Sequence, residues 1–159
     1  GFSQYDNIGV VVHPQSSVHS MVTFTDGATI GQLSNPDMRL CMGYALDWPD
    51  WFEVAYGAID WAELGRLDFE QPDRDGFPCL DLAIAAGRLG ETAPACLNAA
   101  NEVAVAAFLD GVLPWVGIGR LLAEVLDQWP GDPAEDVESV LDVDRRSSEA
   151  TRALVVAGN

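Results

Sequence analysis

Hydrophobic and polar residues alternate along two short segments near the amino terminus, residues 18–24 and 29–33. Alternation with a period of two is typical of a β-strand with one buried face. Asp26 and Gly27 lie between the segments, and such a pair supplies the positive φ angles of a tight hairpin turn. We therefore predict a β-hairpin, followed by a short helix over residues 38–46.

From residue 78 onward the apolar positions recur at helical spacing instead. The clearest case is one helix face that carries five large residues, Ile118, Leu121, Leu122, Val125 and Trp129. Gly90 and Gly111 mark the ends of two earlier helices, and Asp132-Pro133 has the sequence of a helix start with proline at the first position. We expect four helices joined by short loops, which together form a small bundle.

The segment between the hairpin and the bundle is rich in aromatic residues but only weakly periodic. Its aromatic residues are irregularly spaced and include Trp51, Phe52, Tyr56 and Trp61. A turn-forming cluster follows at residues 72–76. The predicted fold is α+β: strands and a helix over residues 1–47, an extended linker over 48–76, and a four-helix bundle over 77–159.

Eight arginines, no lysine and 25 acidic residues give the chain a formal net charge of −17. A strongly negative surface repels phosphate backbones and anionic lipid headgroups, so nucleic-acid and membrane partners are disfavoured. No apolar run approaches the length that spans a membrane. Cys41, Cys79 and Cys96 form no Cys-x-x-Cys pair, so we expect three buried free thiols in a reducing compartment, the cytoplasm.

Side chains capable of chemistry concentrate between His13 and Met38. His13 precedes a proline and has no acidic neighbour in sequence, so we interpret it as a core histidine with satisfied hydrogen bonds. His19 and Ser20 are adjacent on the alternating strand, so they point to opposite faces. Neither histidine has a carboxylate or a second histidine two or four residues later, so we expect no metal ligand in the chain.

Three motifs occur in the order and at the spacing found in one known family. They are the stretch from His13 to Met38, the sequence Phe77-Pro78-Cys79-Leu80, and the sequence Asn98-Ala99-Ala100-Asn101-Glu102. Together they resemble the carboxy-terminal half of the 1-deoxy-D-xylulose 5-phosphate reductoisomerases. The resemblance extends over nearly the whole chain.

The resemblance implies a ligand-facing role for four residues of the hairpin region. Ser16 would offer a hydroxyl to a polar ligand group or to water, and His19 would contribute orientation or charge. Pro36 and Met38 would form an apolar wall against the nicotinamide. The resemblance implies no catalytic residue and no metal ligand here, because the family takes its ligands from the half that this sequence lacks.

For the intact enzyme the resemblance implies a metal-assisted rearrangement of 1-deoxy-D-xylulose 5-phosphate, then hydride transfer from NADPH to give 2-C-methyl-D-erythritol 4-phosphate. The cofactors would be NADPH and Mg or Mn, and the assembly a homodimer formed through the hairpin and its sheet. The chain has no Gly-x-Gly-x-x-Gly motif between a strand and a helix. We therefore interpret it as a fragment that is inactive and binds no cofactor by itself.

An alternative interpretation belongs to another class of protein. The chain would then be a free-standing dimerisation or binding module, derived from the same family, without catalysis. A start codon directly before Gly1 and a closed sheet edge there would favour the module. A nucleotide-binding domain encoded upstream would favour the enzyme.

Overall fold

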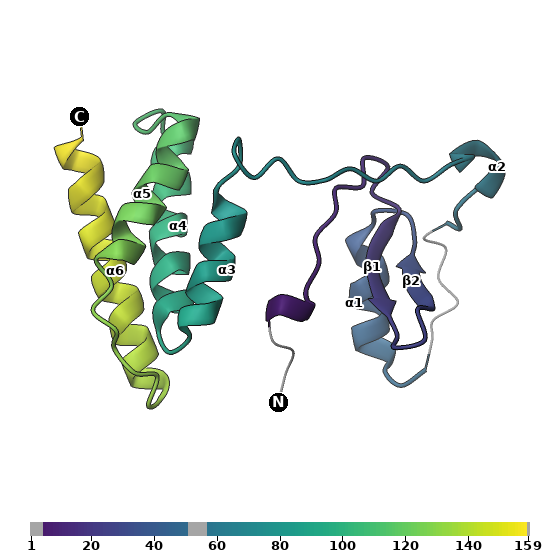
Figure 1. Cartoon of the computed structure of the whole chain (residues 1–159), viewed down its shortest axis with the longest axis horizontal. Helices are drawn as coiled ribbons and strands as arrows, with labels where there is room; N and C mark the ends of the chain where they lie inside the picture. The colour runs from purple at the N-terminus through teal and green to yellow at the C-terminus, as the bar shows by residue number, and fades with distance from the viewer. Residues whose placement is uncertain (1–4, 51–56, 159) are drawn as a thin grey trace. The chain divides into compact units, whose positions relative to one another are not determined.

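The structure is a computed structural model that describes residues 5–50 and 57–158. The chain divides into two compact units, whose elements are labelled in Figure 1. One unit, Val10–Pro72, contains the β-hairpin, and the other contains four helices from Asp73 onward together with the described residues up to Gly9. A two-stranded antiparallel sheet followed by several helices confirms the predicted α+β fold class.

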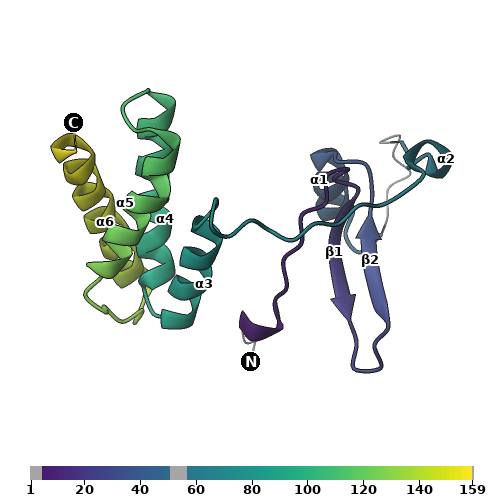
Figure 2. The same cartoon turned by 45° about the horizontal axis from the view of Figure 1, so that its top comes forward.

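The hairpin consists of β1 (Val18–Thr23) and β2 (Thr29–Leu33), which pair antiparallel (Figure 2). Most residues of both strands are exposed, on either face. Val22 and Ile30, which pair across the strands, are 58% and 66% exposed. A two-stranded hairpin is only marginally stable in water unless another element covers it. Among residues 5–50 and 57–158, nothing provides the cover that the alternating sequence of the hairpin predicts.

The loop of the hairpin is longer than the predicted two-residue turn. The Phe24 N–H donates to the carbonyl of Ala28 at 2.8 Å, and this bond encloses a three-residue loop. Gly27 has φ +87°, whereas Asp26 is not among the described non-glycine residues with positive φ. A three-residue loop needs a left-handed residue only at its last position. The expectation of a positive φ at Asp26 is therefore wrong.

Two further helices belong to the hairpin unit, α1 (Met38–Asp47) and the one-turn α2 (Trp61–Leu64). Asp37 caps α1, because its carboxylate accepts a hydrogen bond from the Arg39 N–H at 2.9 Å. The helix predicted over residues 38–46 is thus confirmed. Three aromatic residues of the predicted linker lie outside the described residues: Trp51, Phe52 and Tyr56.

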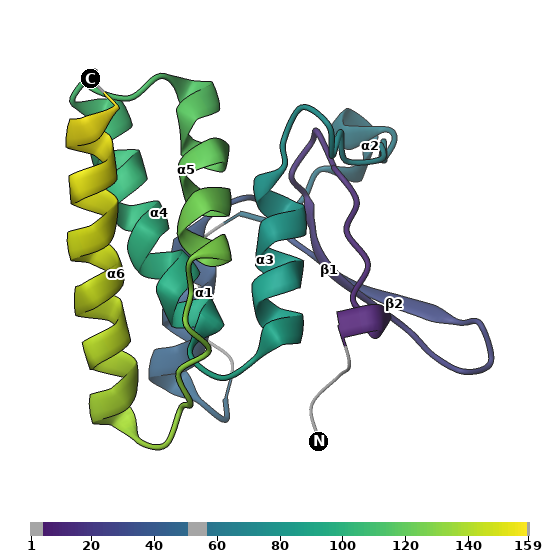
Figure 3. The same ribbon diagram turned by 60° about the vertical axis from the view of Figure 1, so that its left-hand side comes forward.

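The helical unit is a bundle of α3 (Cys79–Leu89), α4 (Ala93–Leu109), α5 (Trp115–Asp127) and α6 (Val137–Ala157). α4 packs against each of the other three helices, as Figure 3 shows. The 3₁₀ turn η1 (Tyr5–Asn7) lies against α3. The predicted four-helix bundle is therefore confirmed.

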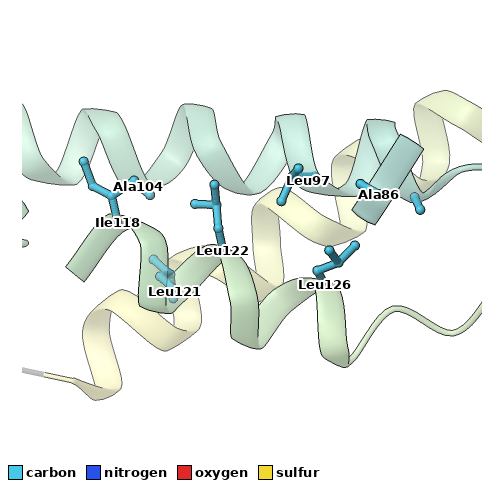
Figure 4. Packing of buried hydrophobic residues seen from close by; sticks show 8 residues of the cluster. Ala86, Leu97, Ala104, Ile118, Leu121, Leu122 and Leu126 are labelled. Atoms are coloured by element: carbon cyan, nitrogen blue, oxygen red, sulfur yellow. The ribbon is translucent and has the colours of Figure 1, made fainter. Parts of the chain in front are cut away.

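Small side chains of α4 meet large side chains of α5 in the core of the bundle (Figure 4). Ala104 and Leu122 belong to one core cluster, in which Ala104 is fully buried and Leu122 is only 3% exposed. Alanine at such positions allows two helix backbones to approach closely. Four residues of the helix face predicted from sequence, Ile118, Leu121, Leu122 and Val125, are buried on α5, whereas Trp129 lies beyond the last residue of the helix, Asp127.

The start of α6 differs from the prediction. The sequence predicted a start at Asp132, but the helix begins at Val137, where Asp136 is the N-cap. The hydroxyl of Thr92, at the start of α4, donates to the Asp132 carbonyl at 2.6 Å. This bond between distant residues holds the preceding segment as a loop, although its local sequence favours a helix.

The cysteines also differ in part from the prediction. All three are free thiols, but only Cys96 is buried, at 2% exposed. Cys41 and Cys79 are exposed, so the expectation of three buried thiols is wrong. Both lie within the first turn of a helix, α1 or α3, where a short apolar context does not reveal which face is buried.

Candidate functional site

The four residues singled out by the resemblance are all exposed and lie near the open end of the hairpin, opposite its loop: Ser16, His19, Pro36 and Met38. Two contacts join the segments that carry them. The Ser34 N–H donates to the Ser17 carbonyl at 3.0 Å, and His19 Nε2 lies 3.2 Å from the Ser34 carbonyl. The structure therefore brings residues 16–19 beside residues 34–38.

His19 occupies an irregular position in β1. Val18 pairs with Leu33 and Ser20 pairs with Gln32, so His19 is the extra residue of a β-bulge. Strict alternation did not anticipate this bulge. Bulges redirect side chains and are frequent beside active sites. The Ser34 carbonyl can only accept, so His19 Nε2 is the donor in their contact.

Ser16 has an unusual backbone conformation, with φ +52°. Its N–H donates to the His13 carbonyl at 3.0 Å, which closes a turn just before β1. A non-glycine residue in the left-handed region costs about 1–2 kcal/mol. Such strain persists only where neighbouring contacts fix the backbone, and it clusters at functional sites.

His13 is half-buried in a setting that the sequence did not predict. Its Nδ1 lies 2.7 Å from the Asp68 carbonyl, and its ring stacks on Phe69 with centroids 4.9 Å apart. Because a carbonyl only accepts, Nδ1 carries the proton in this contact. His13 Nε2 is enclosed and has no hydrogen-bond partner among the described residues. The expectation of a fully satisfied histidine is wrong for this nitrogen.

Met38 is the first residue of α1 and is 68% exposed. Asp37, directly before it, is held by the Arg39 guanidinium, with Nη2 at 2.5 Å and Nε at 2.9 Å from the two carboxylate oxygens. The hydrogen bonds from the Arg39 side chain, and next the one from its backbone N–H, lower the Asp37 pKa from 3.8 to about 2. The start of α1, and with it Met38, is thereby fixed at neutral pH.

The lowered pKa of Asp37 predicts how the α1 cap responds to acid. The cap's contribution to stability is complete above the ordinary pKa of 3.8 and is lost as the pH falls through about 2, because the folded state favours the charged carboxylate. We expect an NMR titration of the Asp37 carboxyl to give a pKa near 2. In Arg39→Leu it should rise toward 3.8, and an unchanged pKa in that variant would refute the assigned cause.

Within residues 5–50 and 57–158, no group of three His, Cys, Asp or Glu side chains is placed to hold a metal ion. Over the same residues, no helix is both long and apolar enough to cross a membrane.

Comparison with known proteins identifies the family. A sequence profile described as the DXP reductoisomerase C-terminal domain matches residues 33–150, most of the chain. The chain belongs to the DXP reductoisomerase family. The match begins at the last residue of β2 and includes α1 and most of the bundle.

Individual reductoisomerases match over an even larger part of the chain. The 1-deoxy-D-xylulose 5-phosphate reductoisomerase of Cupriavidus necator is 47% identical over 152 residues, which cover 96% of this chain and 39% of that protein. The enzyme of Pseudomonas aeruginosa is 46% identical over 145 residues, or 91% of this chain and 37% of that protein. The chain thus spans about two fifths of the length of these relatives.

Solved structures of the family share the fold. The reductoisomerase of Zymomonas mobilis in complex with NADPH superposes with a TM-score of 0.85 at 39% identity, covering 91% of this chain and 38% of that one. A reductoisomerase in complex with NADPH, fosmidomycin and magnesium gives the same TM-score at 36% identity, with the same coverage.

Two residues beside the candidate site are not predicted from the sequence. Gln15 and Asp68 bond each other through both ends of the Gln15 amide. They stand 53 residues apart, and neither lies in a periodic pattern. Gln15 directly precedes Ser16 in the His-Pro-Gln-Ser sequence of residues 13–16, and this position could have indicated that it lies beside the site. Nothing in the sequence indicates the same for Asp68.

Proposed function

We propose that the chain is the carboxy-terminal part of a 1-deoxy-D-xylulose 5-phosphate reductoisomerase. The complete enzyme converts this phosphosugar with NADPH to 2-C-methyl-D-erythritol 4-phosphate, in the synthesis of isoprenoid precursors. The observation that carries the proposal is the 47% identity to the Cupriavidus necator enzyme across 96% of this chain. The TM-score of 0.85 against the NADPH complex of the Zymomonas mobilis enzyme supports it.

Within that enzyme we propose three parts for this chain. Residues 1–47 end the catalytic and dimerisation domain, residues 48–76 form a linker, and residues 77–159 form the carboxy-terminal helical domain. The separation of a hairpin unit, Val10–Pro72, from a helical unit beginning at Asp73 supports the boundary before the helices.

We propose that Ser16, His19, Pro36 and Met38 line the substrate and nicotinamide side of the site. All four are exposed, and hydrogen bonds at Ser34 hold their two segments together. Pro36 and the 68%-exposed Met38 offer apolar surface that fits one face of a nicotinamide ring. Bound NADPH supplies the hydride, and these residues orient the ring and exclude water from it.

The metal of the complete enzyme, Mg or Mn, requires ligands from elsewhere. Among the described residues, no group of three potential ligands comes together. We therefore propose that the chain contributes neither a metal ligand nor a catalytic residue, and that alone it is inactive and binds no cofactor. Its role is to supply Ser16, His19, Pro36 and Met38, which together form the ligand-facing wall, and to carry the helical domain.

We further propose that the chain dimerises through its hairpin. The exposed apolar pair Val22 and Ile30 needs cover, and a free strand edge pairs readily with a second chain. Light scattering should give twice the 17.1 kDa chain mass. Ile30→Glu should be monomeric, whereas Leu109→Glu, at a 75%-exposed position on α4, should remain dimeric. A monomeric parent chain would contradict the proposal.

The compartment we propose is the cytoplasm. Its support is the presence of three free thiols, two of them exposed, which persist where glutathione and thioredoxin keep cysteines reduced. Fractionation of the source cells tests this assignment. Detection of the complete enzyme in the membrane or the exported fraction would contradict it.

Activity tests the proposed function. The test uses a joined enzyme, in which this chain replaces the matching part of the Cupriavidus necator reductoisomerase. We expect the joined enzyme to oxidise NADPH in the presence of 1-deoxy-D-xylulose 5-phosphate and magnesium, and the 159-residue chain alone to oxidise none. Turnover by the chain alone, or a folded but inactive joined enzyme, would refute the proposal.

A further inference from the structure

A set of contacts fastens the residues before β1 to a segment more than fifty residues later. Val12 and Glu70 exchange two backbone hydrogen bonds, each 2.9 Å long. Gln15 Nε2 donates to Asp68 Oδ2 at 2.5 Å, and the Asp68 N–H donates to Gln15 Oε1 at 3.1 Å. These four residues together with His13, whose Nδ1 also bonds Asp68, are called the clasp.

The clasp surrounds the strained residue of the candidate site. Ser16 directly follows Gln15, and its own N–H is bonded to the His13 carbonyl. On the other side Ser17 is buried, at 7% exposed, and its hydroxyl donates to the Gln15 carbonyl at 3.3 Å. The clasp fixes the backbone before Ser16 and the Ser17 hydroxyl fixes it after Ser16, which is what a left-handed serine requires to persist.

We propose that Gln15 and Asp68 are positioning residues that act through Ser16. Their paired hydrogen bonds hold Ser16 at positive φ, and this sets the direction in which its hydroxyl meets the substrate. The inference rests on the proposed function, because it takes Ser16 as a ligand-facing residue. It also gives residues 66–70 a defined task in the site, although they belong to the predicted linker.

An exchange of the two side-chain groups tests the clasp. Gln15→Glu places two carboxylates against each other and removes the donated bond. Asp68→Asn alone keeps an oxygen that accepts from Gln15, and it loses only an exposed ion pair with Arg66, which contributes little. In the double variant the amide introduced at position 68 donates to the carboxylate introduced at position 15. The pairing is thereby restored with its direction reversed and with unchanged net charge.

The first readout is NMR of the 159-residue chain, which reports the Ser16 backbone conformation and the exchange of the Glu70 amide hydrogen. We expect Gln15→Glu to shift Ser16 out of the left-handed region and to speed exchange of the Glu70 amide hydrogen. Asp68→Asn and the double variant should behave like the parent chain. A Gln15→Glu chain that keeps both the Ser16 φ and the Glu70 protection would overturn the clasp.

The second readout is the kinetics of the joined enzyme. Because small misplacements in a site cost up to about 100-fold, we expect Gln15→Glu to lower kcat/KM by about 10- to 100-fold. The double variant should recover it, and Gln15→Glu should add nothing further to Ser16→Ala. A purely structural clasp would instead give additive losses, and that result would overturn the positioning role.

The role of Ser16 and the action of Gln15 and Asp68 through Ser16 are distinguished by two outcomes. If Ser16→Ala keeps full kcat/KM while Gln15→Glu still displaces the Ser16 backbone, the proposed role of Ser16 is wrong and this inference falls with it. If Ser16→Ala loses activity but Gln15→Glu does not, the inference alone is overturned and the proposed function stands.

Discussion

Replacing His19 by Gln in the joined enzyme is expected to lower kcat/KM by about 10- to 100-fold. A hydrogen bond to a charged group contributes about 1.5–3 kcal/mol, which corresponds to that range. His19 is exposed and lies at the bulge of β1, so the substitution should leave folding intact. Steady-state kinetics with varied substrate and NADPH, beside thermal unfolding of the same protein, separate the two effects.

Met38→Ala is the companion variant on the cofactor side of the proposed site. Burying a methionine side chain against a ligand contributes about 1.5–3 kcal/mol, so a comparable loss in kcat/KM is expected. Leu46→Ala is the matched control, because Leu46 is 83% exposed on the same helix, two turns from Met38. It should leave the kinetics unchanged. If His19→Gln and Met38→Ala both retained parental kinetics, the assignment of the ligand-facing wall would be wrong.

Leu122→Ala is expected to lower the free energy of unfolding of the helical unit by about 2–5 kcal/mol. Leu122 is 3% exposed and lies in the core cluster between α4 and α5, beside fully buried Ala104 (Figure 4). Truncation removes apolar contact and leaves a cavity that rigid helix packing cannot fully close. Urea unfolding of the chain, followed by the helical circular dichroism signal, measures the loss.

The matched control for the core is Leu109→Ala at the end of α4. Leu109 is 75% exposed, so its truncation should change stability by no more than about 0.5 kcal/mol. Equal losses for the two leucines would show that the buried face of α5 has been misassigned.

Elements with a strong internal period could be predicted from the sequence. The buried face of α5 follows from residues 118–125, because a helix that buries one side repeats its apolar positions every three to four residues. The strands follow from their period-two alternation, although both faces of the hairpin are mostly exposed in the structure. The residues of the candidate site came from the resemblance to a family, since no period marks Ser16 or Met38.

Features that depend on pairing between distant residues could not be predicted. The bulge at His19 arises from the register of β1 against β2. The late start of α6 arises from the bond between Thr92 and Asp132, which are 40 residues apart. The positive φ of Ser16 is held by the clasp to Asp68, and serine rarely adopts that conformation by itself. In each case the local sequence is compatible with another structure, and a long-range contact decides.

The measurement that tests the central claim most directly is a crystal structure of the joined enzyme with NADPH, fosmidomycin and magnesium, the ligands present in one related structure. We expect Ser16 or His19 to contact fosmidomycin, and Pro36 or Met38 to lie within about 4 Å of the nicotinamide ring. Ligands bound in the enzyme with all four residues turned away from them would contradict the account.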